Sequence, residues 1–268
     1  MNDIRAKLTY HAVYDESIIS ALKYAQKLGF AGIQLAVETP HFSFEELSPK
    51  EIAEIGSFRE QNDLLLSIHA PDSLTSMFTS SPTLLAGIFD YLEKLLSFAQ
   101  TVGAHIVTLH PGAPVVYRTD EASPRTFPYV DEKIYRALFR DNLKRLTELN
   151  EGKTTICFES YQTSPILFTE LEEHLQKGNF YLCWDVAKTW GKSEVEDYLW
   201  QHLDMVKQVH LHDVREGRSH LIVGQGEIDF QPYLRAFKGS NIAEVCFEVR
   251  PKEAALKSKK ELFKLLKE

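Results

Sequence analysis

Cysteine and long apolar runs are both scarce in this chain of 268 residues. Its three cysteines are an odd number without clustered spacing, which argues against a disulfide framework. No apolar run approaches the roughly 20 residues needed to span a bilayer, so we expect no contact with a membrane. The first ten residues lack the apolar core of a signal peptide, and a reducing cytoplasm is therefore the expected location.

An excess of basic charge is missing as well. The chain carries 30 basic and 38 acidic residues, a formal net charge of -8. This balance disfavours broad non-specific binding to nucleic acid, although it stays compatible with a local basic patch. Hydrophobic residues make up 44% and charged residues 25%, as in ordinary globular proteins. Composition leaves the oligomeric state open.

Short runs rich in Val, Ile, Leu and Phe alternate with amphipathic stretches along the chain. Strands that are covered on both faces are apolar throughout, and eight runs have this character: 4–10, 31–37, 64–69, 105–110, 154–159, 180–185, 206–212 and 243–249. Helical periodicity is clear over 16–28, 83–102 and 132–150, each with a glycine soon after its end. The alternation predicts the α/β class and one closed, parallel (β/α)8 TIM barrel over residues 1–268. A doubly wound open sheet is the alternative.

Six of the predicted strands end on a residue that can bind a metal ion. These residues follow one another from the third run to the eighth: His69, His110, Glu159, Asp185, His210 and Glu248. Active sites of such barrels lie at the carboxyl ends of the strands, so we expect the six side chains to meet at one barrel mouth.

The alternation of side chains along a strand supports this convergence. Three of the carboxylates follow a cysteine by two residues and share its face, in the pairs Cys157 and Glu159, Cys183 and Asp185, and Cys246 and Glu248. The residue within each pair is a large aromatic suited to packing under the outer helices. The sequence thus predicts small cysteines inside the barrel, with carboxylates above them.

Several carboxylates directed into one mouth would repel one another unless a cation lay among them. Each residue taken singly has an ordinary alternative, in which it is hydrogen-bonded or caps a helix. Six residues at equivalent positions with the same parity favour a shared site. A mixed set of Glu, Asp and His suits Mn²⁺, Zn²⁺, Mg²⁺ or Co²⁺. We expect one divalent ion, with a second as the alternative.

Seven motifs follow one another along the chain: SIHAP, LHPG, FES, WDVAK, VHLHD, HLIVGQGEIDF and FEVRP. Together they resemble the xylose-isomerase-like TIM-barrel superfamily, which holds sugar isomerases, sugar epimerases and the endonuclease IV enzymes (AP endonuclease family 2). The isomerase and epimerase branch implies metal ligands at Glu159, Asp185, His210 and Glu248. It further implies that Glu159 and Glu248 are catalytic and exchange protons with the substrate. The implied substrate is a small sugar, sugar phosphate or polyhydroxy ketone.

The nuclease branch is the alternative, and it implies a metal-dependent phosphodiesterase or AP endonuclease. His69, His110 and His220 match its ligand positions, so they are candidates for a second metal or for substrate binding. Lys188 and Arg218 stand where that branch has further ligands, and their positive charge argues against its third zinc. We expect these two residues either to bind an anionic substrate group or to point to solvent.

Three further positions bear on the site. His212 follows His210 by two residues, and we favour a substrate-binding or structural role for it over metal ligation. His11 follows the first predicted strand, where a surface or capping role is expected unless it reaches the barrel mouth. Ser160 stands where many relatives carry Asn, which leaves the substrate class open.

A sugar-binding barrel without turnover is a third functional hypothesis. The complete set of predicted metal ligands argues against it.

Overall fold

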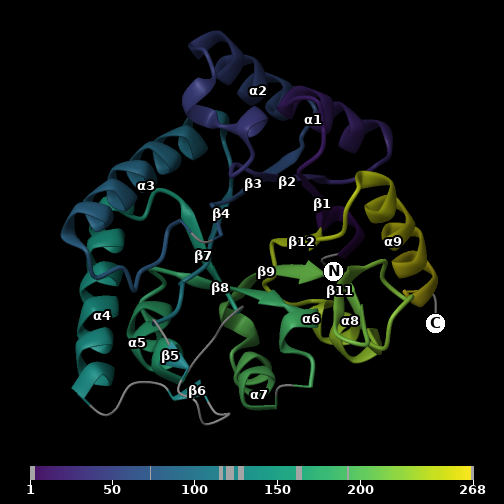
Figure 1. The fold of residues 1–268 in the computed structure, drawn as a ribbon. Helices are drawn as coiled ribbons and strands as arrows, with labels where there is room; N and C mark the ends of the chain where they lie inside the picture. The colour runs from purple at the N-terminus through teal and green to yellow at the C-terminus, as the bar shows by residue number, and fades with distance from the viewer. Residues whose placement is uncertain are drawn as a thin grey trace.

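Eight parallel strands close into a barrel. The structure, a computed structural model, describes residues 4–72, 74–114, 117–118, 124–125, 130–160, 165–191 and 193–266. The strands follow each other around the ring in chain order, and the last strand pairs with the first. Helices surround the ring on its outside (Figure 1). The predicted (β/α)8 TIM barrel is confirmed.

The barrel strands lie close to the predicted runs. They are β1 (Leu8–Ala12), β2 (Gly32–Ala36), β3 (Leu65–His69), β4 (Ile106–Leu109), β7 (Thr155–Glu159), β8 (Tyr181–Asp185), β9 (Val206–Leu211) and β12 (Glu244–Phe247). The helices described are α1 (Ile18–Lys27), α2 (Pro49–Gln61), α3 (Pro82–Val102), α4 (Val130–Asn150), α5 (Pro165–Gln176), α6 (Val186–Thr189), α7 (Ser193–Gln201), α8 (Gln231–Phe237) and α9 (Lys252–Leu265). Short 3-10 helices cover Ile4–Lys7, Pro40–Phe42, Phe44–Glu46 and Leu203–Met205. Within these ranges, no helix is long and apolar enough to cross a membrane.

The two faces of the strands are divided as the alternation predicts. Cys157 and Cys183 pack together with Ile106 inside the barrel, and both thiols are fully buried. Trp184 points the other way and packs edge-on against Trp200 of α7, with ring centroids 4.8 Å apart. The small side chains therefore form an inner layer, and the carboxylates that follow them face the mouth.

The first strand begins later than expected. We predicted a strand over 4–10, whereas Ile4–Lys7 form a 3-10 helix and β1 covers Leu8–Ala12. Tyr10 packs outward, with its hydroxyl donating to the carbonyl of Ala21 in α1 at 3.2 Å. His11, the next residue, therefore points into the barrel, where it is 3% exposed. It is not the surface or capping residue that we expected.

Two antiparallel ladders were not predicted. β5 (Tyr117–Arg118) pairs with β6 (Pro124–Arg125), and β10 (Asp213–Arg215) pairs with β11 (Arg218–Leu221). The second ladder bears on the site because it brings the chain back toward the barrel mouth with His220 on its returning strand.

Candidate metal centre

Carboxylate and imidazole groups from four strand ends meet at the mouth of the barrel. Glu159 ends β7, Asp185 ends β8, His210 lies near the end of β9, and Glu248 directly follows β12. One ligand atom of each residue lies within 4.8 Å of the other three, and all four residues are buried. The structure thus brings together the four residues predicted to hold a metal ion.

His210 lies between the two glutamates. Its Nδ1 is 3.2 Å from Glu159 Oε2 and 3.5 Å from Glu248 Oε2. Among the residues that the structure describes, His210 Nδ1 and Glu248 Oε2 are buried without a hydrogen-bond partner. An unpartnered buried polar atom costs about 1–3 kcal/mol, and a cation at their shared point would remove both costs. The donor set therefore fits a divalent ion.

The surroundings of both glutamates favour their ionised forms. Burial alone would raise the pKa of Glu159, but the imidazoles of His110 and His210 hold that pKa well below its usual value. Burial would likewise raise the pKa of Glu248, but its contact with His210 lowers that pKa well below the usual range. Arg250 adds a charged donor, with Nη2 3.3 Å from Glu248 Oε1. Carboxylates that stay ionised can bind a cation or accept a proton.

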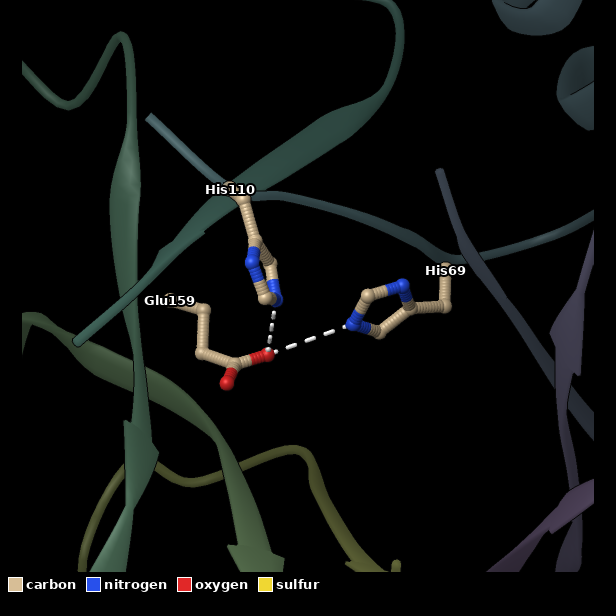
Figure 2. Close-up of side chains that lie close together, drawn as sticks. All are labelled: His69, His110 and Glu159. Atoms are coloured by element: carbon tan, nitrogen blue, oxygen red, sulfur yellow. Dashed lines mark hydrogen bonds and ion pairs between the residues drawn. The ribbon is translucent and has the colours of Figure 1, made fainter. Parts of the chain in front are cut away.

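A second cluster shares Glu159. His69 Nε2 and His110 Nε2 lie 3.2 Å and 3.0 Å from the same Glu159 oxygen, Oε2, while the other oxygen points away from both rings (Figure 2). The remaining ring nitrogens are also held, since His69 Nδ1 contacts the carbonyl of Ala70 at 2.9 Å and His110 Nδ1 contacts Asp72. Metal-bound histidines commonly have such outer partners. This cluster fits the second metal or substrate role predicted for the two histidines.

The charges of the second cluster strongly raise the pKa of one imidazole. Burial alone would lower the pKa of His110, but the carboxylates of Glu159 and Asp72 raise it to about 10. A metal-free site therefore holds a protonated imidazole beside Glu159 at neutral pH.

His212 holds Asp185 in place. His212 Nδ1 accepts a hydrogen bond from the backbone N–H of His220 at 3.0 Å, so the ring carries its hydrogen on Nε2. That nitrogen lies 3.2 Å from Asp185 Oδ2. The other Asp185 oxygen accepts the backbone N–H of Lys188 at 3.0 Å. The geometry fits a structural role for His212 toward Asp185, one of the two roles favoured for it.

The returning hairpin places His220 at the rim of the site. Its backbone has a φ of +59°, a region that residues other than glycine rarely occupy. The ring lies 4.4 Å from the ring of His212, and His220 Nδ1 is 3.0 Å from the backbone carbonyl of Glu248. One ligand atom each of His212, His220 and Glu248 falls within 4.8 Å of the others. His220 is thus near enough for the substrate or second-metal role predicted for it.

The two predicted substrate-binding cations differ in position. Lys188 is half-buried on α6, three residues after Asp185, and its charge helps to lower the pKa of His220, which burial lowers most. Arg218 is exposed at the start of β11, where its backbone pairs with Arg215. Anion binding by Lys188 and Arg218 stays a prediction.

Two contributors to the site, Gln34 and Arg250, were not predicted from the sequence, and for His11 a place at the mouth was only the alternative. Gln34 contacts His210, Arg250 contacts Glu248, and buried His11 contacts Arg250, with its Nδ1 accepting from Arg250 Nη2 at 3.0 Å. A single polar residue within an apolar strand is the signal that could have revealed Gln34. A cavity of about 150 Å³ beside these groups is lined by His11, Val13, Tyr14, Asp15, Arg250, Pro251, Lys252 and Glu253.

Known proteins share both the sequence pattern and the fold. A family model described as "xylose isomerase-like TIM barrel" matches residues 22–267. The chain belongs to this family. Two uncharacterized proteins of Methanocaldococcus jannaschii are 24% and 23% identical to it over 189 and 175 residues. The first match covers 67% of this chain and 68% of the relative, and the second covers 64% and 61%.

Solved structures of this family's fold include epimerases and a nuclease. A D-tagatose 3-epimerase-like protein is similar with a TM-score of 0.77 at 20% identity, over 97% of each chain. Endonuclease IV from Thermus thermophilus has a TM-score of 0.73 at 18% identity, over 97% of this chain and 99% of that one. The 3-keto-D-glucoside 4-epimerase from E. coli has a TM-score of 0.73 at 15% identity, with the same two coverages. Identities this low establish the fold alone.

Proposed function

We propose that this chain is a divalent-metal-dependent epimerase or isomerase of small sugars, sugar phosphates or related polyhydroxy ketones. The observation that carries the proposal is the convergence of Glu159, Asp185, His210 and Glu248 within 4.8 Å, with buried atoms of His210 and Glu248 left without hydrogen-bond partners. The similarity to two epimerase structures supports it.

Those four residues would hold one ion, Mn²⁺, Zn²⁺, Mg²⁺ or Co²⁺, which would supply positive charge to the carbonyl and hydroxyl oxygens of the substrate. Glu159 and Glu248 carry the protons. One glutamate removes the proton from the carbon beside the carbonyl, and the other returns a proton to the opposite face or to the neighbouring carbon. Arg250 donates a hydrogen bond to Glu248, and the adjacent cavity offers space for the substrate.

Solvent exchange tests this proposal directly. We expect the metal-loaded protein to exchange a carbon-bound hydrogen of at least one ketose or ketose phosphate with deuterium from D₂O, measured by NMR over a broad panel. Glu159→Gln and Glu248→Gln should each slow this exchange by roughly 10²–10⁴-fold, since each removes a proton carrier. Glu170→Gln is the control, because Glu170 lies on α5 and pairs with Arg136 of α4 at 2.8 Å. Absence of exchange across the panel, despite bound metal, would refute the proposal.

One observation favours a second function, metal-dependent cleavage of phosphodiesters. His69 and His110 form a second group with Glu159, and a single ion held by the first four residues would not need their two ring nitrogens. Two ions flanking one carboxylate suit phosphodiester hydrolysis. Metal analysis and cleavage of abasic DNA separate the two functions. Two bound ions with cleavage, and a DNA affinity that falls with salt, would establish the nuclease instead.

A further inference from the structure

A cavity of about 150 Å³ lies at the barrel mouth between the two loops that follow β1 and β12. These strands are neighbours in the ring, and α9, which follows the second loop, packs beside β1 (Figure 1). Glu248 directly follows β12, so the cavity adjoins the candidate metal centre. It leaves room for a chemical group of several heavy atoms next to one of the residues proposed to move protons.

Arg250 is shared by this cavity and the candidate metal centre. Its Nη2 lies 3.3 Å from Glu248 Oε1 and 3.0 Å from His11 Nδ1. Its Nε is buried without a hydrogen-bond partner among the described residues. His11 also lines the cavity, is 3% exposed, and has no described partner for its Nε2. Buried polar atoms are rarely left unpartnered in native proteins, so two of them in one cavity wall point to a polar ligand.

The first turn of α9 adds backbone donors to the same wall. This helix of 14 residues begins at Lys252, and Pro251 at its N-cap has no side-chain group that could cap it. The Pro251 carbonyl accepts the N–H groups of Ala254 and Ala255, whereas no described side chain caps those of Lys252 and Glu253. Uncapped N–H groups carry the positive end of the helix dipole and attract anions. In TIM barrels, phosphate groups commonly bind at a helix start after the last strands.

The charged side chains around the cavity leave a surplus of hydrogen-bond donors. Lys252 Nζ lies 2.7 Å from Asp15 Oδ1, so the buried Asp15 carboxylate already has a counter-charge. Glu253 is exposed, and solvent screens its charge. The groups that remain without partners include Arg250 Nε and the first N–H groups of α9. Guanidinium and backbone N–H groups only donate, so a ligand group that only accepts complements them.

We propose that this cavity is an anion subsite, and that the substrate of the metal centre is a sugar with a terminal phosphate or carboxylate. Arg250 and the first turn of α9 bind the anionic oxygens, while Glu248 faces the reacting carbon. Tyr14 lines the cavity and is 71% exposed, so its ring is available to pack against the carbon chain between the two ends. The inference rests on the proposed function and narrows it to anionic sugars.

Binding of two small anions tests the subsite without any turnover. Inorganic phosphate and acetate are titrated separately into the full-length, metal-loaded protein, and isothermal titration calorimetry gives each Kd. We expect the anion that matches the substrate to bind the wild type, with phosphate tighter for a phosphorylated sugar and acetate tighter for a sugar acid. Binding of neither anion would overturn the subsite.

Four variants locate the bound anion. Lys252→Met leaves the Asp15 charge unopposed, and Arg250→Lys keeps the charge but removes Nε, so each should raise Kd roughly 10-fold. Asp15→Asn frees the charge of Lys252 and should lower Kd severalfold. Lys257→Met is the matched control, because it removes the same charge from the exposed side of α9. Thermal unfolding identifies any variant that has lost its fold.

Equal affinity in all four variants would overturn the subsite, since the anion would then bind elsewhere, for example on the ion itself. An effect of Lys257→Met as large as that of Lys252→Met would also overturn it, because only the net charge would matter.

Solvent-deuterium exchange identifies the substrate class. Ketose phosphates and sugar-derived keto acids are each compared with the corresponding neutral ketose. We expect kcat/KM to be at least 10-fold higher for the anionic member of one pair, and Lys252→Met should reduce that preference roughly 10-fold. A wild type that prefers the neutral member of every pair would overturn the inference and leave the proposed function standing. Absence of exchange with every sugar, despite local anion binding, would instead remove the proposed function and leave the anion subsite.

Discussion

His105 and Glu244 form an acid–imidazole pair at the amino-terminal ends of the strands, away from the candidate metal centre. His105 Nε2 lies 3.1 Å from Glu244 Oε2, and the carboxylate is fully buried. Burial alone would lower the pKa of His105, but the hydrogen bond and charge of Glu244 raise it above the ordinary value. The pair holds together β4 and β12, which are not neighbours in the ring.

Burial alone would raise the pKa of Glu244, but its contacts with His105, Thr9 and Ser67 hold that pKa below the usual value. The sign of the pH dependence follows from these two shifts. A raised pKa of His105 contributes stability below the unfolded value of about 6.5, and that stability is lost as pH rises through the folded value. The lowered pKa of Glu244 contributes stability that is lost at acidic pH. The difference in Tm between the wild type and His105→Phe should therefore be largest near pH 5–6 and shrink toward pH 9, as circular dichroism can measure. A difference that grows with pH would contradict the ion pair.

The sequence revealed strand-end residues better than residues within strands. Glu159, Asp185 and His210 could be predicted because each follows an apolar run, and the ends of parallel strands meet. Gln34 was missed because one polar residue inside a strand has no periodicity of its own. His11 was placed outside the first strand because the predicted run ended at residue 10, whereas β1 continues to Ala12.

Elements added to the barrel were harder to predict than the barrel itself. The hairpin of β10 and β11 turns at Glu216 and Gly217, whose φ values of 49° and 75° are both positive, as in a type I′ turn. The Glu-Gly pair is a weaker signal than Asn-Gly or Asp-Gly, and its flanking strands are polar. The proximity of His220 to Glu248 depends on this hairpin. It could therefore not be derived from the order of the barrel strands.

One carboxylate holds the turn that follows this hairpin. Asp213 Oδ1 accepts the backbone N–H groups of Val214 and Ile228, and Oδ2 accepts those of Gly224 and Gly226, at 2.7–3.2 Å. Gly224 and Gly226 thus serve the backbone geometry of this turn. A side chain at Gly226 would overlap the Asp213 carboxylate and the Val214 carbonyl.

Gly226→Ala should therefore destabilise the protein by roughly 1–3 kcal/mol through overpacking. For a domain of this size, that corresponds to a fall in Tm of about 2–12 °C, measurable by calorimetry. Gly87→Ala is the matched control, because nothing lies within 4 Å of its added Cβ on the exposed face of α3. The control should gain about 0.5–1 kcal/mol from helix propensity. Equal effects of the two substitutions would contradict the role of Asp213.

Ring closure explains why residues so far apart in the sequence make one centre. β12 pairs with both β1 and β9, which brings Glu248 beside His11 and His210. The helices between the strands cover the outside of the ring and leave the carboxyl ends of the strands to build the mouth (Figure 1). Sequence alternation predicted this closure, with a doubly wound open sheet as the alternative. It did not determine which side chain touches which, because that depends on the register between strands and on buried hydrogen bonds.

The same closure makes metal occupancy a property of the whole molecule. An ion held by β7, β8, β9 and the residue after β12 stabilises only the closed ring, so binding should raise the Tm of the entire protein. At a free concentration of 100 times Kd, the expected gain is about 2.7 kcal/mol, or roughly 5–10 °C. Scanning calorimetry across a series of Mn²⁺ or Zn²⁺ concentrations measures this gain, and EDTA should reverse it.

Two variants locate the ion. Asp185→Asn should lose most of the gain in Tm because the amide is a much weaker ligand, whereas Glu170→Gln should keep the gain. If the wild type and Asp185→Asn gain equally, the ion binds elsewhere on the molecule and the four strand ends do not form its site.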